Sequence, residues 1–308
     1  MRVLSLFDGI SCAHVALEKA GIEVEEYYAS EVDKHAKSIT QKRFPMTIQL
    51  GDVKEVKYIE GITLLIGGSP CIDLSVAKKD RKGLEGEHSS LFWEYVRVWK
   101  LVKPTWFIFE NVASMPLKDK EIITTTLGVE PILINASLVS AQNRKRLFWT
   151  NIPNVSLPED KGILLSHILQ PNSEVDERFV MNGKSFCLTS SYSKVSASPA
   201  QIEHNAKKKQ RTMVRVGHIG NSQGQANRVY DPEGKSVSLT SNAGGLGGKT
   251  GLYKVENEIR KLTPIECERL MGLPDDYTEG IPMTQRYKCL GNAFHVDVIS
   301  HILSFIEK

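Results

Sequence analysis

The 308-residue sequence has no Cys-x-x-Cys pair and no apolar run near the ~20 residues that span a bilayer. Its five cysteines are odd in number and widely spaced, which argues against a disulfide framework and a zinc site, and for a reducing cytosol. The Gly-x-Gly-x-x-Gly pattern of pyrophosphate-binding loops is missing at the first expected strand-to-helix turn, where Gly9 stands alone. A dinucleotide cofactor, a metal and a membrane partner are therefore not expected.

The charge that is present is unevenly distributed. The net charge is +3, but residues 184–260 hold 12 Lys and Arg against 5 Asp and Glu, so this part carries +7 and the remainder −4. A basic segment on a mildly acidic body favours a polyanionic partner that meets one part of the protein. A well-solvated surface would show the same modest excess, so charge alone leaves both interpretations open.

The opening of the chain is typical of a cofactor site. An apolar strand is expected at 3–7, then a glycine turn and a helix with Ser11 as its N-cap. The next strand ends on Glu31, ~20 residues after the turn, where a carboxylate can accept hydrogen bonds from ribose hydroxyls. Asp52 could accept from an adenine amine. This favours a ligand with a ribose but no phosphates, such as S-adenosylmethionine, over NAD or FAD. Either acid could instead simply cap a helix.

A second candidate site follows the apolar run 63–66, at the turn Gly67-Gly68-Ser69-Pro70-Cys71. The glycines allow a sharp turn and Pro70 disfavours helix at Ser69, so the thiol is expected on a loop at a strand end, where ligands bind in open α/β sheets. A buried cysteine that closes a turn is the commoner role. The polar, basic stretch 73–90 lacks periodicity and suits a loop that closes over a phosphate backbone.

Charged residues also follow two later strands. The apolar run 106–109 leads to Glu110, and a carboxylate there is costly unless it is paired or used in chemistry. Arg144 and Arg146 are two residues apart in an extended segment, so they are expected on the same face of it. Each arginine taken alone could be an ordinary surface cation.

The texture changes after residue 153. The stretch 171–258 is rich in Ser, Asn, Gly and Lys, which predicts a small, irregular, mostly β domain with strands near 235–240 and 251–255. The basic run 207–211 could lie along phosphates or form a solvated face.

Globular texture then returns. A helix capped by Thr263, with Pro264 in its first turn and Gly272 at its end, is followed by a last helix with an apolar stripe. The large domain is therefore expected to resume after the small one.

Seven motifs in order resemble those of the DNA (cytosine-5)-methyltransferases across nearly the whole chain. They read Leu6-Phe7-Asp8-Gly9, Glu31 with Asp52, Pro70-Cys71, Glu110-Asn111-Val112, Gln142-x-Arg144-x-Arg146, Arg269-Leu270-Met271-Gly272-Leu273-Pro274 and Tyr287-Lys288-x-x-Gly291-Asn292-Ala293. The details around 4–10, 29–32 and 68–75 look most like the vertebrate de novo branch. The compact length looks more like a bacterial or phage enzyme.

The resemblance implies an α/β fold of the class I S-adenosylmethionine-dependent methyltransferase type. This is a Rossmann-like, doubly wound sheet with a small, mostly β target-recognition domain. The chain would divide into a catalytic domain (1–170), a target-recognition domain (171–258) and a segment (259–308) that returns to the catalytic domain. The implied reaction moves a methyl group from S-adenosylmethionine to C5 of a flipped-out cytosine in duplex DNA, with S-adenosylhomocysteine as product.

The resemblance also implies residue roles. Cys71 would add to cytosine C6 as a thiolate, Glu110 would act as general acid at N3 and the exocyclic amine, and Arg144 and Arg146 would serve O2 and the loop. S-adenosylmethionine would contact Phe7, Asp8, Gly9, Ile10, Ser11, Glu31, Val32, Asp52, Val53, Ser69, Pro70, Leu91, Asn292 and Ala293. DNA would contact Ser75, Lys78, Lys79, Arg81, Gln142, Lys207, Lys208, Lys209, Arg211 and Arg228.

The implied partner is double-stranded DNA, bound by a monomer in the cytoplasm of a bacterial or phage-infected cell, with or without a cognate restriction endonuclease. An RNA cytosine methyltransferase of the same fold is the nearest alternative, which the long basic domain disfavours. A nicotinamide-dependent oxidoreductase could share the opening turn but would need the missing glycines. A DNA-binding module with an inactive methylase fold is disfavoured by Cys71, Glu110 and Arg144.

Overall fold

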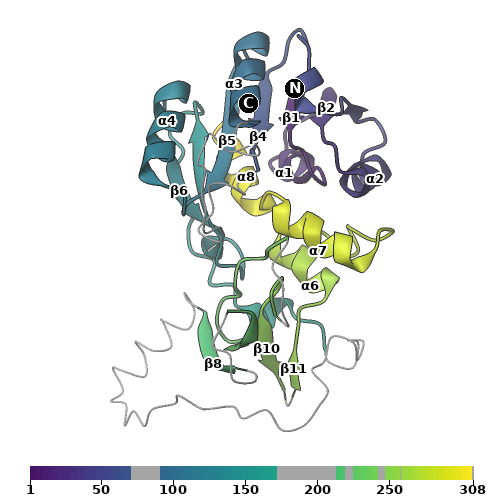
Figure 1. Cartoon of the computed structure of the whole chain (residues 1–308), viewed down its shortest axis with the longest axis vertical. Coiled ribbons are helices and arrows are strands. Elements are labelled where there is room, and N and C mark those ends of the chain that lie inside the picture. Colours follow the sequence, from purple (N-terminus) through teal and green to yellow (C-terminus); the bar gives the residue numbers. More distant parts are fainter. Residues whose placement is uncertain (71–90, 172–212, 219–224, 242–246, 257, 307–308) are drawn as a thin grey trace. The chain divides into compact units, whose positions relative to one another are not determined.

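The computed structural model describes residues 1–70, 91–171, 213–218, 225–241, 247–256 and 258–306 (Figure 1). The chain forms two compact units. The first comprises Met1–Asn135, Lys145–Leu157 and Val298–Lys308, and the second comprises Ala136–Arg144 and Pro158–Asp297. The domain boundaries expected at 170 and 258 stay a prediction. None of the helices in the described ranges is long and apolar enough to cross a membrane.

The first unit is built on a seven-stranded sheet in the order β3-β2-β1-β4-β5-β7-β6. Its strands are β1 (Arg2–Leu6), β2 (Glu26–Ser30), β3 (Ile48–Gln49), β4 (Leu64–Gly67), β5 (Trp106–Val112), β6 (Ile132–Asn135) and β7 (Lys145–Thr150). The pairs from β3 to β5 are parallel, and β7 runs antiparallel to both β5 and β6. The chain reverses its direction of strand addition between β1 and β4, so the carboxyl ends of these strands form the edge where ligands bind in such sheets.

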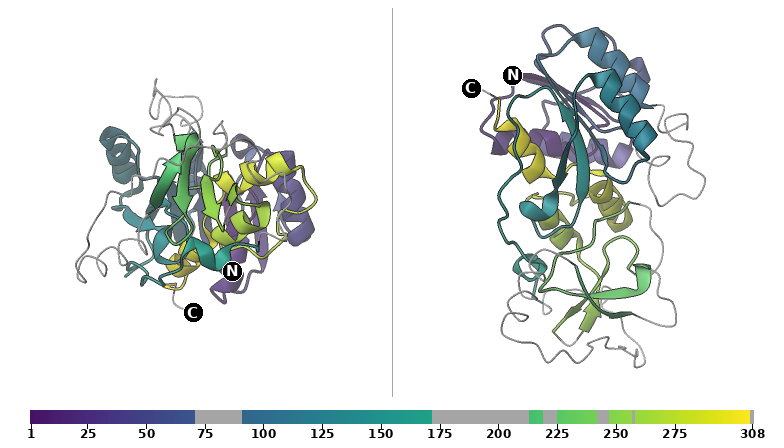
Figure 2. Two further views of the ribbon diagram at one scale, coloured as in Figure 1. Left: turned by 90° about the horizontal axis from the view of Figure 1, so that it is seen from below. Right: turned by 90° about the vertical axis from the view of Figure 1, so that its left-hand side faces the viewer.

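Helices cover the sheet because each presents an apolar stripe to it. They are α1 (Cys12–Lys19), α2 (Lys34–Arg43), α3 (Leu91–Val102) and α4 (Leu117–Leu127), with the short η1 (Val53–Glu55). Figure 2 shows α3 and α4 against one face of the sheet. Phe92 and Tyr95 of α3 are fully buried there, and their ring centroids lie 5.2 and 4.8 Å from that of Phe109 in β5. This aromatic packing fixes β5, and with it the residues that follow Phe109.

The second unit contains a four-stranded sheet in the order β11-β10-β9-β8. Its elements are η3 (Ala136–Leu138), η4 (Leu165–Ile168), β8 (Val214–His218), η7 (Gln225–Asn227), β9 (Arg228–Asp231), β10 (Leu252–Val255), β11 (Glu258–Arg260), α6 (Pro264–Leu270) and α7 (Met283–Asn292), and α8 (Val296–Leu303) begins in it. The strand expected near 251–255 is confirmed by β10. The strand expected at 235–240 is wrong, since only Ser236 forms a β-bridge, with Gln142.

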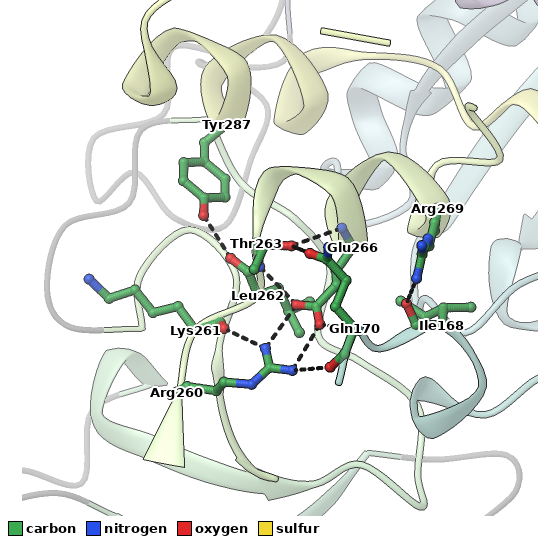
Figure 3. Close-up of polar contacts among 9 residues, drawn as sticks. All are labelled: Ile168, Gln170, Arg260, Lys261, Leu262, Thr263, Glu266, Arg269 and Tyr287. Atoms are coloured by element: carbon green, nitrogen blue, oxygen red, sulfur yellow. Dashed lines mark hydrogen bonds and ion pairs between the residues drawn. The ribbon is translucent and has the colours of Figure 1, made fainter. Parts of the chain in front are cut away.

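The cap expected at Thr263 is confirmed, and it forms a capping box with Glu266 that extends into a buried ion pair (Figure 3). Thr263 Oγ1 accepts from Glu266 N, and Glu266 Oε2 accepts from Thr263 N. The Arg260 guanidinium donates to both Glu266 oxygens at 2.9 Å and also to the Gln170 carbonyl at 3.1 Å. Both charged side chains are fully buried. The chain on either side of residues 171–259 is thus held together at one point.

We expect Arg260→Met to destabilise the protein by about 3–5 kcal/mol, because it leaves the Glu266 carboxylate buried without its counter-ion. Arg260→Met combined with Glu266→Gln should recover part of this loss, since the neutral amide still accepts from Thr263 N. Urea unfolding of the wild type and both variants measures the three free energies. A loss below ~1 kcal/mol in the single variant would show that the pair stabilises no more than a surface salt bridge.

Candidate active site

The loop after β1 is formed by backbone of unusual handedness. Phe7, Gly9 and Ser11 have φ values of 56°, 62° and 56°, which is rare for residues with a side chain. The left-handed backbone at Phe7 means that β1 ends at Leu6, one residue earlier than expected. A Cβ placed on Gly9 meets no atom within 4 Å, so the space above this glycine is open. The loop offers backbone groups to a ligand, with a glycine at its most open point.

Buried hydroxyl groups support this loop from beneath. Asp8 is only 4% exposed, and its two carboxylate oxygens accept from Tyr27 Oη at 2.7 Å and from Ser11 Oγ. The Ser11 hydroxyl also contacts Thr40 Oγ1 at 2.9 Å. Ser11 is the N-cap residue of α1, as expected, but its side chain makes no capping hydrogen bond. Its backbone is left-handed, and its hydroxyl donates to Asp8 instead. Burial raises the pKa of Asp8 to about 6.

This carboxyl predicts an unusual pH dependence of stability. Between about pH 4 and 6 the folded protein holds a proton on Asp8 that the unfolded chain has lost, so this group's contribution falls as pH rises, by on the order of 3 kcal/mol. His14 acts in the opposite sense, because burial lowers its pKa to about 4 and the unfolded chain then binds the extra proton. The wild-type free energy of unfolding should therefore change little from these two groups across that range.

In Asp8→Asn only His14 titrates, so we expect the free energy of unfolding to rise from pH 4 to 6. In His14→Phe only Asp8 titrates, so we expect the free energy of unfolding to fall over the same range. The aromatic replacement suits a ring that stacks on Tyr27 and Phe44 at 4.5 and 3.8 Å between centroids. Denaturant unfolding at several pH values from 4 to 7 gives the three curves. Parallel curves for the three proteins would contradict this assignment.

Glu31 follows β2, and its carboxylate is held by three backbone N–H groups. Oε2 accepts from Gly9 N at 2.8 Å, and Oε1 accepts from Val32 N and Asp33 N, both at 2.7 Å. The predicted ribose acceptor and the glycine loop therefore form one unit. Val32 is 68% exposed, a high value for an apolar residue beside a candidate ligand site.

Asp52 caps η1, which is one of the two roles expected for it, and its Oδ1 accepts from Lys54 N at 3.0 Å. The preceding Gly51 has a φ of 77° and open space where a Cβ would stand. Its carbonyl accepts from Ser30 Oγ at 2.9 Å, which ties this turn to the end of β2. Capping by one oxygen is compatible with recognition of an adenine amine by the other. Open glycines beside two oriented carboxylates fit a ligand that has a ribose and an adenine but needs no phosphate cradle.

The loop after β4 is tied to the end of β5. Asn111 Nδ2 donates to Ser69 O at 3.3 Å and Ser69 Oγ at 3.4 Å, and Asn111 Oδ1 accepts from Val112 N. Ser69 is buried, while Pro70 and Leu91 are partly buried. The predicted nucleophile Cys71 lies outside the described residues. So do eight of the predicted DNA contacts, Ser75, Lys78, Lys79, Arg81, Lys207, Lys208, Lys209 and Arg211.

Glu110 lies near the end of β5 and pairs with an arginine of β7. Arg146 Nε is 2.7 Å from Glu110 Oε1, and the two side chains are 18% and 14% exposed. The antiparallel register brings them together, since Arg146 is opposite Val112 and Glu110 is opposite Phe148. A charge-assisted contact on one carboxylate oxygen orients the other. The sequence identified both residues but not that they form a pair.

Arg144 has different partners from Arg146, and the expectation that the two share a face stays a prediction. It precedes β7 and is only 4% exposed. Its guanidinium donates to the carbonyls of Leu239, Gly291 and Ala293 at 3.3, 3.2 and 3.0 Å. Gln142 is fully buried, so a contact with DNA would require its segment to open. Among the remaining predicted contacts, Asn292 is exposed, Ala293 is buried and Arg228 is partly buried.

Comparison with known proteins identifies the family. The model of the C-5 cytosine-specific DNA methylase family matches residues 1–308. The chain belongs to this family. It is a DNA (cytosine-5)-methyltransferase that uses S-adenosylmethionine, as the motif resemblance implies.

Similar proteins include bacterial and phage enzymes. The type II methyltransferase M.HhaI of Haemophilus parahaemolyticus is 30% identical over 322 residues, covering 98% of this chain and 93% of that protein. The orphan methyltransferase M.Rho11sI of Bacillus phage rho11s is 31% identical over 309 residues, covering 84% and 61%. The methyltransferase EhMeth of Entamoeba histolytica is similar in structure, with a TM-score of 0.70 at 16% identity, covering 99% and 97%. The predicted fold class is confirmed.

Sequence reasoning missed several residues that shape this methyltransferase's site. Tyr27 and Thr40 support the glycine loop, and Lys235 binds the segment that carries Arg144. A tyrosine in an apolar strand and a threonine in a helix give no signal of their own. Lys235 lies where the sequence predicts a strand, and a lysine in a strand is ordinarily solvated, so it gives no signal of a buried role. Among the described residues no cluster of His, Cys, Asp or Glu could hold a metal ion.

Proposed function

We propose that this methyltransferase acts on a flipped-out cytosine within a specific duplex DNA sequence, through a covalent bond from Cys71 to C6. The observation that carries the proposal is the Glu110–Arg146 pair, with Asn111 beside it bound to Ser69. Ser69 is two residues before Cys71, so the candidate acid and the loop leading to the candidate nucleophile meet at the carboxyl ends of adjacent strands β4 and β5. A base inside a duplex cannot enter such a site without leaving its stack.

The chain's own residues supply the activation of the ring. The Cys71 thiolate adds to C6, and the C5–C6 electron pair moves into the ring while Glu110 donates a proton to N3. Arg146 holds Glu110 Oε1, which orients the carboxyl group toward the base. The enamine-like C5 is then nucleophilic. After methylation a base removes the C5 proton. The C6–S bond then breaks to release Cys71 as thiolate, and the N3 proton returns to Glu110, which restores the neutral base and the acid.

S-adenosylmethionine supplies an electrophilic methyl group and leaves as S-adenosylhomocysteine. In this chain Glu31 would accept from the ribose hydroxyls, and Asp52 would accept from the adenine amine. Phe7, Asp8, Gly9, Ile10 and Ser11 would lie along the ligand, with the side chain of Asp8 beneath the loop. The further contacts predicted at Val32, Val53, Ser69, Pro70, Leu91, Asn292 and Ala293 remain part of this proposal.

DNA recognition is proposed for the basic, mostly β part of the chain and for the stretch after Cys71. Both are rich in Lys and Arg, which would contact phosphates, while the target-recognition segment 171–258 reads bases in the major groove. Arg144 and Arg146 would serve the cytosine O2 and the loop. In the described conformation the Arg144 guanidinium binds the carbonyls of Leu239 and Ala293.

We further propose a monomer in the cytoplasm of a bacterial or phage-infected cell. The relatives named type II are consistent with a modification enzyme that accompanies a restriction endonuclease, and those named orphan with one that has no such partner. We also propose a likeness to the vertebrate de novo branch, limited to the sequence stretches 4–10, 29–32 and 68–75. These stretches are proposed to serve S-adenosylmethionine and the nucleophile rather than the choice of target.

Methyl transfer from tritium-labelled S-adenosylmethionine tests the proposal. Duplex DNA should accept label and tRNA should not. Bisulfite sequencing of DNA from a host that expresses the enzyme should show 5-methylcytosine at one short sequence. Label in tRNA alone would make the protein an RNA methyltransferase. Cytosine methylation scattered without a shared sequence would contradict specific recognition.

A further inference from the structure

Lys235 is a fully buried lysine whose ammonium group binds three backbone carbonyls of the second unit. Its Nζ lies 2.8 Å from Ser137 O, 3.0 Å from Ser140 O and 2.5 Å from Ile163 O. An ammonium has three protons, so each can serve one carbonyl. Burial lowers the pKa of Lys235, and the Asp160 carboxylate opposes this effect. A buried charge is costly, and here the cost is offset by fixing the backbone at three points.

Two of those carbonyls belong to the loop 136–144, which leaves the large sheet after β6 and returns to it at β7. The ends of this loop are joined by Ala136 N donating to Arg144 O at 3.0 Å. Lys235 binds the interior of the loop at Ser137 and Ser140. The loop is therefore closed by a hydrogen bond between its two ends, and the Lys235 ammonium binds carbonyls within it.

The residues after Lys235 continue along the same loop. Ser236 N donates to Ala141 O at 2.8 Å, and Ser236 O accepts from Asn143 N at 3.0 Å. The carbonyl of Leu239 accepts from Arg144. Residues 235–239, which we call the strap, thus follow the loop from its start to Arg144. This pairing is also the reason why 235–240 does not form a strand of the small sheet.

The loop contains the first two named residues of the Gln-x-Arg-x-Arg motif, Gln142 and Arg144. Arg144 is its last residue, and Arg146, two residues further on, pairs with Glu110. The strap lies within the segment 171–258 predicted to recognise DNA. A change in the strap can therefore reach Arg144 and Arg146 through the loop backbone alone.

We propose that Lys235 is a positioning residue for methyl transfer, which holds the loop 136–144 in the conformation that places Arg144 and Arg146 for the reaction. The proposal rests on the proposed function, since it assigns these arginines to the cytosine and its acid. Misplacing a catalytic group by about 1 Å can cost on the order of 100-fold in rate. Loss of the ammonium should therefore lower the rate of methyl transfer by enzyme that is saturated with S-adenosylmethionine.

The test compares Lys235→Met, which keeps the length of the side chain but has no donor, with Lys235→Gln, which keeps a neutral donor. Lys161→Met is the matched control, because Lys161 is an exposed lysine of the same unit. The stoichiometry of S-adenosylmethionine binding counts the folded molecules. Single-turnover methylation of duplex DNA, at saturating DNA and S-adenosylmethionine, then gives the rate for each of those molecules.

We expect Lys235→Met to bind one equivalent of S-adenosylmethionine and, once saturated with it, to methylate about 10- to 100-fold more slowly. Lys235→Gln should be intermediate and Lys161→Met unchanged. A rate within twofold of wild type for each binding-competent molecule would overturn the proposal. So would failure of both Lys235 variants to fold, because the residue would then serve stability alone. If the wild-type enzyme itself methylates no DNA, the proposed function fails and not merely the role of Lys235.

Discussion

Cys71→Ala is expected to abolish methyl transfer while leaving the binding of S-adenosylmethionine and DNA intact. Cytosine C5 is a poor nucleophile until a thiolate adds to C6, and an alanine cannot form that bond. Loss of an essential nucleophile typically costs more than about 10⁴-fold in rate. The residues proposed to hold S-adenosylmethionine, Glu31 and the loop around Gly9, contact each other and do not depend on the thiol.

The measurement is methylation of duplex DNA from labelled S-adenosylmethionine, together with the dissociation constants of both ligands. Duplex DNA with 5-fluorocytosine at the target adds a direct test, because fluorine cannot leave C5 as a proton does. The wild type should remain covalently attached to this DNA, and Cys71→Ala should not. Cys12→Ala is the matched control, since Cys12 is a buried cysteine of α1. Appreciable turnover by Cys71→Ala would refute the covalent mechanism.

Glu110→Gln is expected to lower the single-turnover rate by about 10²- to 10⁴-fold, the usual contribution of a positioned general acid. The amide keeps the size of the side chain and can still form hydrogen bonds, but it has no proton to give to N3. It also loses the charge that attracts the Arg146 guanidinium, 2.7 Å away. Binding of S-adenosylmethionine should be unchanged.

Arg146→Met separates the two effects of that substitution. If Arg146 acts by orienting Glu110, removing both partners should cost little more than removing Glu110 alone, because residues in one contact are not additive. A double-mutant cycle on the single-turnover rate measures this coupling. Costs that simply add would show that Arg146 acts independently of Glu110. Glu121→Gln, on α4, is a suitable control for the loss of a carboxylate.

Local features of the chain were predictable because they depend on residues close together in sequence. Thr263, Pro264 and Glu266 specify the start of α6, since the cap, the fixed φ and the reciprocal hydrogen bond lie within four residues. Gly272 marks the end of α6 for the same reason, with a φ of 76° just after the C-cap Met271. The position of Glu31 at a strand end followed from the spacing of one strand, one turn and one helix.

Features that depend on distant partners were not predictable. Ser11 has the identity of an N-cap, but Tyr27 and Thr40 complete a buried network that draws its hydroxyl to Asp8. Lys235 and its neighbours alternate like a strand, yet the ammonium binds carbonyls 95 and 98 residues away. No local pattern encodes such contacts, because the free energy that decides them comes from burial of groups brought together only by the whole fold.

The amino-acid sequence by itself determined the family and the identities of the candidate nucleophile, acid and ribose acceptor. It also indicated which strand each of these residues follows. These follow from short motifs, each of which can be recognised from neighbouring residues without knowledge of the tertiary structure. Only the tertiary structure decided that Arg146 pairs with Glu110 while Arg144 is buried against Ala293, 149 residues away. Two arginines in one motif are chemically equivalent along the chain, and they differ only in the oxygens that packing brings to each of them.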